Sequence, residues 1–278
     1  MVVFWKCNKY NLQAMRKMMI QGLVVLASFF STWFLLQQVD WISVFKVKKI
    51  TEKTEEKLSE LFWEFFKKNE KEITDQFVTN TIDSLLTKLC VCNNINRSQI
   101  KIHLLDKNEV NAFALPNGRI VIYSDLILAA ENQEELSGVI SHELAHIELN
   151  HVMKKLMKEI GLNVLISMIT GGSGTDAIGE AAKLLSSTAF DRSMEREADI
   201  KAVDYLIKAN IDPEPFAHFL YKLSDSESDA MKYLSWISTH PDSKERAKDI
   251  IEYSVNKAKG AEPVLSQGTW LMLKEKLL

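Results

Sequence analysis

The residues best suited to chemistry in this chain are two histidines, His142 and His146, which begin and end the motif His-Glu-Leu-Ala-His. Side chains four positions apart project from one face of a helix about a turn apart, so both imidazoles can reach a single zinc ion. Glu143, the second residue of the motif, would then point toward the open coordination position of that ion. The motif predicts a zinc site with a carboxylate placed to act as a general base.

The sequence around the motif predicts that its polar side chains are buried. An apolar stripe at helical spacing starts with Leu136, Val139 and Ile140 and continues into Glu143 and His146. A buried glutamate and histidine without partners cost on the order of several kcal/mol, and a cation between them removes this cost. A chance match within an ordinary amphipathic helix is the alternative, so a third ligand is needed.

A second pair of candidate residues lies about fifty positions downstream, in the segment DRSMEREADIKAVDYL. Glu195 and Asp199 are four apart on an expected helix and therefore share a face. Glu195 as third ligand completes a two-histidine, one-carboxylate zinc site with a free position for water. Asp199 can accept the other ring N–H of a zinc-bound histidine and fix its tautomer. Taken alone, the segment is also typical of a solvated charged helix face, which is where we place Glu197.

Other kinds of binding chemistry have less support in the sequence. A structural zinc site usually has four protein ligands, often cysteines, but Cys7, Cys90 and Cys92 form no C-x-x-C pair and are too few for a disulfide framework. The 34 basic and 37 acidic residues give a net charge of −3, and no electrostatic footprint for nucleic acid stands out. The content of 46% hydrophobic and 26% charged residues is typical of a globular protein.

One long uncharged run precedes these motifs. From Met18 to Val39 no residue carries a charge, and as a helix the run would extend about 33 Å, enough to cross a bilayer core of about 30 Å. Basic residues precede the run without any acidic one, namely Lys6, Lys9, Arg16 and Lys17. They predict a cytoplasmic N-terminus, although further lysines after the run weaken this signal. A cleaved signal peptide and a buried core helix are the two alternatives.

The rest of the chain alternates between helical and strand patterns. Helical periodicity dominates residues 51–94 and 131–223, and Asn132 with Glu135 resembles a capping box at the start of the motif helix. Between these regions IKIHLL alternates, and NAFALPNGRIVIY is typical of two short strands joined across residues 116–118. We predict an α+β, mainly helical fold with a small antiparallel sheet.

The simplest partition gives a cytoplasmic segment at residues 1–17, a transmembrane anchor at 18–39 and one catalytic domain at 40–278. No internal repeat or low-complexity tract suggests a further subdivision. Within the catalytic domain, the glycine-rich stretch GGSGTDAIG lies between two apolar segments. It is either a mobile cover or membrane-surface element near the site, or a plain loop between helices.

Four stretches together resemble the membrane-associated gluzincin metallopeptidases of family 48, which include the HtpX-type, BepA-type and OMA-type proteases and the CAAX prenyl proteases. These stretches are NAFALPNGRIVIYSDLI, SHELAHIELNH, DRSMEREAD and STHPDSKER, and the match covers roughly residues 75 to 255. The resemblance implies a zincin-like fold, zinc ligands at His142, His146 and Glu195, and Glu143 as general base. The chain departs from the types with several spans and from the BepA type with its helical-repeat domain, so their substrates are not carried over.

The resemblance also gives expectations for two further parts of the site. The strand formed by Asn111, Ala112, Phe113 and Ala114 looks like the edge on which gluzincins lay an extended substrate, although an ordinary structural hairpin explains the same alternation. His240, which a proline follows in STHPDSKER, is expected near the metal. There it either caps the open zinc position, stabilises a developing oxyanion, or only packs beside the proline.

These features favour a membrane-anchored, zinc-dependent endopeptidase with one Zn2+ per chain, acting in the periplasm on misfolded or membrane-associated proteins. Two alternatives stay open: a catalytically silent zinc-holding scaffold that binds client proteins, and a metal-dependent hydrolase of another substrate class. His151 is expected at a helix end or beside a ligand, and His103 and His218 in structural positions. Nothing in the sequence indicates an oligomeric state.

Overall fold

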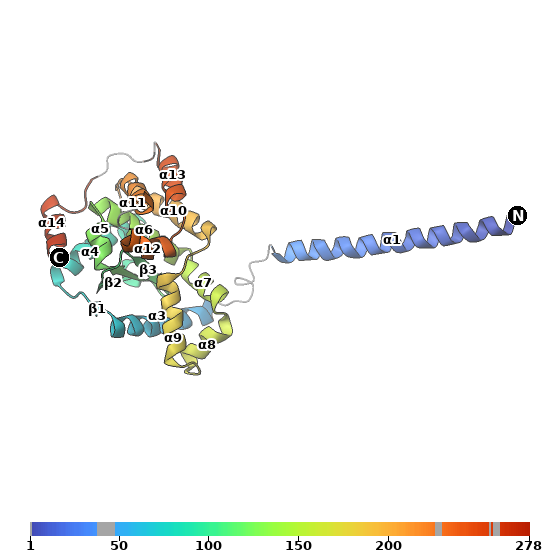
Figure 1. The fold of residues 1–278 in the computed structure, drawn as a ribbon, viewed down its shortest axis with the longest axis horizontal. Coiled ribbons are helices and arrows are strands. Elements are labelled where there is room, and N and C mark those ends of the chain that lie inside the picture. The colour runs from blue at the N-terminus through green and yellow to red at the C-terminus, as the bar shows by residue number, and fades with distance from the viewer. Residues whose placement is uncertain (1, 38–47, 226–229, 256, 258–261) are drawn as a thin grey trace. The chain divides into compact units, whose positions relative to one another are not determined.

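The computed structural model describes residues 2–37, 48–225, 230–255, 257 and 262–278. The chain divides into two compact units, residues 1–51 and 52–278 (Figure 1). The first contains helix α1 (Val2–Gln37), within which Arg16–Phe34 is long and apolar enough to cross a membrane. The long apolar helix is the one expected from the sequence, and residues 38 and 39 of the expected span lie outside the described part.

Among the described residues, the second unit contains four strands and the remaining helices, the first of which begins a few residues before the boundary. The strands are β1 (Lys71–Glu72), β2 (Lys101–Asp106), β3 (Ala112–Leu115) and β4 (Arg119–Tyr123). The helices up to the motif are α3 (Lys48–Asn69), α4 (Gln76–Cys92), the 3-10 turn η1 (Arg97–Gln99), α5 (Ser124–Ala129) and α6 (Gln133–Glu148). Those that follow are α7 (His151–Glu159), α8 (Leu162–Thr170), α9 (Thr175–Ser187), α10 (Arg192–Lys208), α11 (Glu214–Asp225), α12 (Ala230–Thr239), α13 (Ser243–Ser254) and α14 (Gln267–Glu275).

The sheet is mixed, which corrects the antiparallel sheet expected from the sequence. Its strand order is β1-β2-β4-β3, with β2 parallel to β4 and the other two pairs antiparallel. β4 lies inside the sheet, between β2 and β3, and all five of its residues are buried because both faces of the sheet are covered. β3 is consequently displaced to the end of the order. A sequence pattern indicates where strands lie in the chain, but it does not indicate which strands occupy the inner positions of the sheet.

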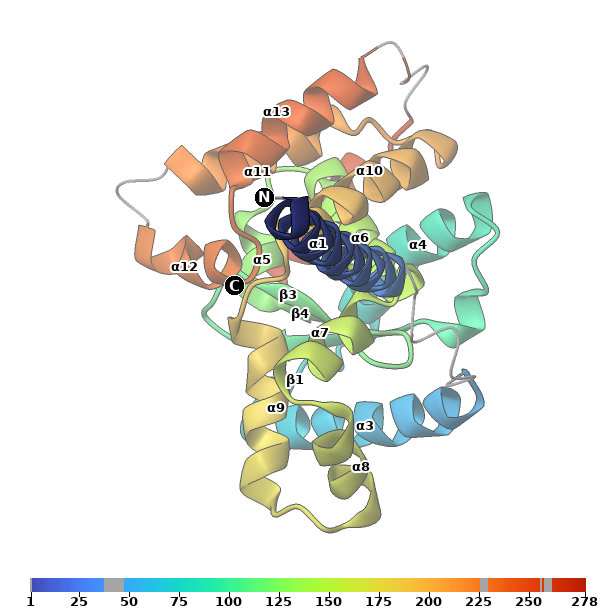
Figure 2. The same ribbon diagram turned by 90° about the vertical axis from the view of Figure 1, so that its right-hand side faces the viewer.

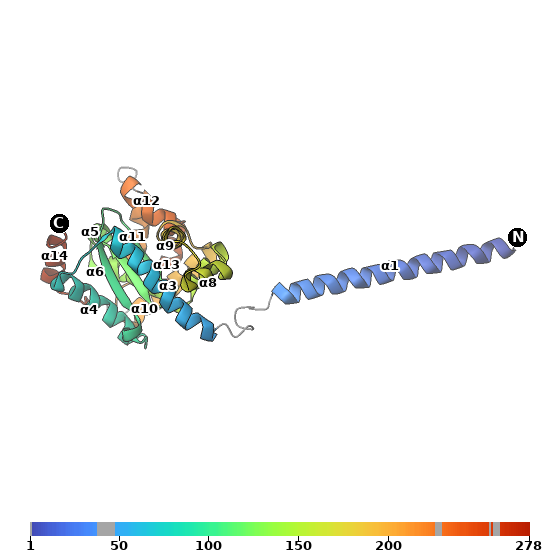
Figure 3. The ribbon, with the colours of Figure 1, turned by 90° about the horizontal axis from the view of Figure 1, so that it is seen from below.

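Helices cover both faces of the sheet (Figures 2 and 3), and a hydrophobic core lies on each face. Alternate residues of β4 supply the two cores, since Ile120 and Ile122 belong to the core with α4, α6, α10 and α11, whereas Val121 and Tyr123 belong to the core with α3, α7, α8 and α9. Successive side chains of β4 therefore point alternately toward the two layers of helices. The helix with the histidine motif is in the first layer.

The turn between β3 and β4 lies where the sequence predicts it. Asn117 and Gly118 both have positive φ angles, 57° and 72°. A Cβ atom on Gly118 would lie 2.3 Å from the carbonyl oxygen of Gln99, so only glycine fits this position. The hairpin fixes β3 beside α6, which contacts it.

Helix α6 begins at the predicted cap. The side chain of Asn132 accepts a hydrogen bond from the backbone N–H of Glu135 at 2.9 Å. The carboxylate of Glu135 in turn accepts one from the N–H of Glu131, a residue earlier than in a regular capping box. The start of the helix is thereby fixed, and with it the rotation that sets which side chains face α10.

The glycine-rich stretch is shorter as a loop than the sequence suggests. Helix α8 ends at Thr170 and α9 begins at Thr175, so the second half of GGSGTDAIG is helical. Gly179 lies within α9 against the ring of Phe65 in α3, where the absence of a side chain permits close approach. The stretch is a helix-to-helix turn followed by a packed helix.

Candidate metal centre

Helix α6 presents the two histidines of the motif toward a single point. His142 and His146 are fully buried, and their Nε2 atoms lie 2.9 Å apart. The Nδ1 atom of His142 faces the other way, 3.0 Å from Asp199 Oδ1. Two ring nitrogens this close require a proton or a cation between them, because their lone pairs otherwise repel. The four-residue spacing therefore produces the convergent nitrogens expected of a metal site.

Helix α10 packs against α6 and brings Glu195 to the same point. One carboxylate oxygen lies 3.3 Å from His146 Nε2 and the other lies 3.5 Å from His142 Nε2. The Glu195 side chain is buried as well. Two imidazoles and one carboxylate are a donor set that catalytic zinc sites use, so these residues fit the ion predicted from the sequence.

The residue that follows α12 adds a fourth donor. His240 Nδ1 lies 3.2 Å from each oxygen of Glu195 and 3.3 Å from His142 Nε2. One ligand atom from each of His142, His146, Glu195 and His240 lies within 4.8 Å of the others. His240 Nε2 is 3.4 Å from Glu143 Oε1. The imidazole therefore lies between the ligand cluster and the candidate base.

The electrostatics of the centre favour positive charge between the ligands. Burial opposes protonation of His142, but the carboxylates of Asp199 and Glu195 outweigh it and raise the pKa of this histidine to about 9. Burial raises the pKa of the neighbouring Glu143 carboxyl to about 8, and the charge on His142 partly opposes that rise. A metal ion bound by these donors would also lower the pKa of Glu143, as the charge on His142 does.

Arg246 is part of this site, although the sequence analysis did not single it out. Its guanidinium donates two hydrogen bonds of 2.7 Å to Asp199, and its third nitrogen lies 2.6 Å from a Glu195 oxygen. Burial alone would raise the pKa of both carboxyl groups, but Arg246 together with the neighbouring histidines outweighs burial and holds both pKa values low. The signal was present in STHPDSKER, since two buried carboxylates on one helix face require a cation.

The model of peptidase family M48 matches residues 77–254, which is more than half of the chain. The chain belongs to this family. Beta-barrel assembly-enhancing protease of Yersinia pestis is 28% identical over 222 residues, which are 74% of this chain and 44% of that protein. Metalloprotease LoiP of Escherichia coli is 32% identical over 165 residues, 57% of this chain and 64% of that protein. Mitochondrial metalloendopeptidase OMA1 of Arabidopsis thaliana is 25% identical over 72% of this chain and 40% of that protein. The chain thus spans less than half the length of two of these three relatives.

In this member of peptidase family M48, α7 supports the metal centre from behind. His151 Nδ1 lies 3.1 Å from His146 Nδ1, and His151 Nε2 lies 3.2 Å from Glu197 Oε2. The expectation that Glu197 is solvated is therefore only half right, since its side chain is 61% exposed but one oxygen contacts a buried histidine. The helical wheel places Glu197 away from Glu195, and the path of α7 brings a partner to that side.

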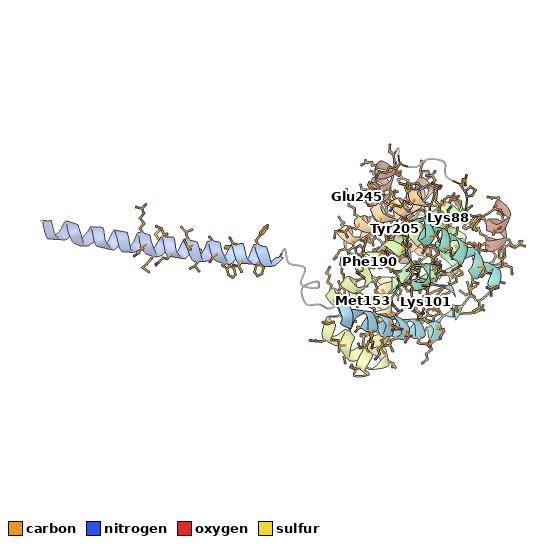
Figure 4. The ribbon with its side chains drawn as sticks, turned by 180° about the vertical axis from the view of Figure 1, so that it is seen from behind. Lys88, Lys101, Met153, Phe190, Tyr205 and Glu245 are labelled. Carbon is orange, nitrogen blue, oxygen red and sulfur yellow. The ribbon has the colours of Figure 1, made fainter. Side chains whose placement is uncertain are left out.

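Lys155, one turn after His151 on α7, is a second support. It is 3% exposed, donates a hydrogen bond to the carbonyl oxygen of Thr188 and lies 4.2 Å from the ring centroid of Phe190. Phe190, labelled in Figure 4, stacks on the His146 ring with centroids 4.0 Å apart. Sequence patterns gave no sign of this lysine, because a charged residue on an amphipathic helix is normally assigned to solvent.

The strand predicted to bind substrate lies beside the metal centre of this family member. Ala112, Phe113 and Ala114 form most of β3, the last strand in the sheet order, and their side chains are buried. Asn111 precedes them, and its carboxamide donates to the Ser186 carbonyl at the end of α9 and to the Ser235 hydroxyl in α12. Its side chain is engaged within the protein, and its role toward substrate stays a prediction.

The remaining two histidines lie outside the metal centre of this family member, as expected. His103 is in β2 and stacks on Trp63 with ring centroids 3.8 Å apart, between Glu72 and Arg119. His218 is on the surface of α11, next to Glu214. Both have partners that explain their positions without a metal.

Proposed function

We propose that this protein is a zinc-dependent endopeptidase. The observation that carries the proposal is the convergence of His142, His146 and Glu195 on one point, with the Glu143 carboxylate next to them. Zinc held by such a donor set lowers the pKa of a water molecule to about 7 and polarises a peptide carbonyl. A peptidase of this kind needs no nucleophilic side chain, and the roles of the residues follow from their positions.

Glu143 takes the proton of the attacking water and returns it to the leaving amine. Its carboxyl group is buried, and burial raises its pKa above that of an exposed glutamate, whereas the charge of a bound metal ion would lower it again. Both effects together suit a group that accepts a proton and then releases it near neutral pH. Asp199 accepts a hydrogen bond from His142 Nδ1 and keeps the Nε2 lone pair of that ring available. Arg246 neutralises Asp199 and fixes the orientation of Glu195.

The substrate is proposed to be an extended peptide segment laid along β3. Asn111, Ala112, Phe113 and Ala114 are proposed to bind it. The strand contacts α6, and the Glu143 carboxylate is within reach of the backbone N–H of Ala114. Pairing with the end strand of a sheet uses main-chain hydrogen bonds and therefore selects little by side chain. Such a site suits unfolded or misfolded proteins.

We further propose that α1 anchors the enzyme in a membrane, with the N-terminus in the cytoplasm and the catalytic unit in the periplasm. The span Arg16–Phe34 has the length and composition for this, and basic residues precede it. The name of the Yersinia pestis relative refers to assembly of β-barrels, and the related enzyme of Arabidopsis thaliana is a mitochondrial metalloendopeptidase. A role in quality control of misfolded or membrane-associated proteins accords with both.

The test is cleavage of unfolded casein by the purified full chain, with and without a chelator. We expect metal-dependent cleavage by the wild type, one zinc per chain, and loss of cleavage with retained zinc in Glu143→Gln. His146→Ala should lose the zinc itself, because this change removes a ligand. Intact casein with both the wild type and His240→Ala, each with bound zinc, would instead identify a zinc-holding scaffold.

A further inference from the structure

His151 lies behind His146, on the side of that ring opposite the candidate ion. The Nε2 atom of His146 faces His142 and Glu195, whereas its Nδ1 atom lies 3.1 Å from His151 Nδ1. His151 is fully buried, and its Nε2 atom lies 3.2 Å from Glu197. A continuous path of hydrogen bonds therefore leads from the exposed carboxylate of α10 through two imidazoles to the candidate ion.

The chemistry of the neutral imidazole allows only one assignment of protons along this path that leaves His146 able to bind metal. A ligand at Nε2 must carry its proton on Nδ1 and donate it to the Nδ1 lone pair of His151. His151 then carries its own proton on Nε2 and donates it to Glu197, so each donor meets one acceptor. The reverse arrangement would place a proton on His146 Nε2, between the ligands, and would remove the lone pair that the ion needs.

The two motif histidines therefore have different partners at their Nδ1 atoms. His142 has a carboxylate, Asp199, directly at its Nδ1 atom. Among the described residues, the neighbour that hydrogen-bonds His146 Nδ1 is another imidazole, and the carboxylate is one step further away on Glu197. Both carboxylates come from α10, so the same helix orients both ligands of α6.

We propose that His151, oriented by Glu197, is a positioning residue that fixes the tautomer and ring orientation of His146. The inference rests on the proposed zinc site and adds to it a residue that touches neither substrate nor ion. Removal of such a hydrogen-bond partner typically lowers metal affinity or activity by about 10- to 100-fold. A histidine that only fills space would show no dependence on its hydrogen-bonding atoms.

Two variants of similar size separate these roles. His151→Leu removes the acceptor at the Nδ1 position, whereas the carboxamide oxygen of His151→Asn can take that position and accept from His146. For the full chain in detergent, we expect His151→Leu to weaken zinc binding about 10- to 100-fold in chelator competition, and to change the visible spectrum of the cobalt(II)-substituted protein. His151→Asn should restore most of the affinity and the wild-type spectrum.

A second pair of variants changes Glu197, whose side chain is 61% exposed, so the fold should be retained. Glu197→Ala should weaken zinc binding, and Glu197→Gln should weaken it less because its side-chain oxygen still accepts a hydrogen bond. Glu180→Ala, an exposed glutamate in α9, is the control and should bind zinc as the wild type does. Thermal unfolding of each metal-free variant shows whether the fold is retained.

The outcomes distinguish this inference from the proposed function. A wild-type protein that binds no zinc overturns both. If the wild type binds zinc and His151→Leu and Glu197→Ala bind it equally well, only the role of His151 is wrong. Equal loss of affinity in His151→Leu and His151→Asn, with a lowered melting temperature of the metal-free protein in both, would show that His151 merely packs.

Discussion

His240 presents its Nδ1 atom to the other donors and its Nε2 atom to Glu143. Burial lowers the pKa of this imidazole to about 4, and the Glu195 carboxylate opposes the shift only in part. The ring is therefore neutral at neutral pH, with a lone pair free to bind metal. Of the roles considered from the sequence, we expect the one in which this histidine caps the open zinc position.

Replacement of His240 tests this role. We expect His240→Ala to raise the basal turnover of a short peptide by about tenfold or more, because a larger fraction of molecules then has an accessible zinc position. The comparison with wild type is made at matched zinc occupancy. A fall of about 100-fold would show that His240 stabilises the oxyanion, and an unchanged rate would show that it only packs beside Pro241.

Lys155 carries a charge that the fold stabilises poorly. Burial lowers the pKa of its ammonium group to about 8, from about 10.5 in an unfolded chain. Between these pH values the unfolded chain binds more protons than the folded protein, so the contribution of this group to stability improves as the pH rises from about 8 to 10.5. Below pH 8 the full cost of the buried charge is present.

The prediction for this residue follows from the direction of the shift. Lys155→Met should raise the free energy of unfolding at pH 7 by about 1–3 kcal/mol, and the gain should shrink toward pH 10.5. Denaturant unfolding at pH 7, 9 and 10.5 measures it, with Lys154→Met, an exposed neighbour, as control. A variant that is less stable at pH 7 would mean that the contacts with Thr188 and Phe190 outweigh the cost of burial.

Among the elements, α6 approaches α11 closely at Gly138. A Cβ atom on Gly138 would lie 2.3 Å from Cβ of Phe216, so the two helices approach each other as closely as a glycine permits. Phe216 is fully buried, and its ring centroid lies 6.1 Å from that of His142. The contact sets the distance between α6 and the helix behind the metal ligands.

Gly138→Ala should therefore destabilise the protein, although alanine favours helix formation. We expect a loss of about 1–3 kcal/mol or more in the free energy of unfolding, measured by denaturant titration, because neither backbone can move without disturbing the core. Gly268→Ala in α14 is the matched control, since a Cβ there meets no atom closer than 3.9 Å. It should leave stability unchanged or slightly raised. Equal effects of the two changes would contradict the close crossing.

For the whole molecule, the prediction concerns the anchor. The full chain should pellet with membranes and resist extraction with carbonate, and a reporter fused after Leu278 should behave as extracytoplasmic. A span of this length held in the bilayer is not released by high pH, whereas a peripheral protein is. Recovery of a soluble form that starts near Gln37 would show instead that the apolar run is a cleaved signal peptide.

Local spacing determined much of this protein from the sequence alone. The four-residue intervals from His142 to His146 and from Glu195 to Asp199 placed each pair on one helix face, and alternation with the turn at residues 116–118 located the hairpin. These features depend only on the helical and strand periods, which act between neighbours in the chain. They sufficed to predict most of the elements and, together with the family resemblance, to propose a donor set, which stays a prediction.

The tertiary structure decided what depends on segments distant in the chain. The parallel pairing of β4 with β2 made the sheet mixed. Arg246 reached α10 from a helix almost fifty residues further on, and His151 connected Glu197 to His146. Each of these contacts results from how elements pack around two shared cores. Periodicity in the sequence does not predict such packing, because the burial and the partners of each residue depend on all the elements that pack around it.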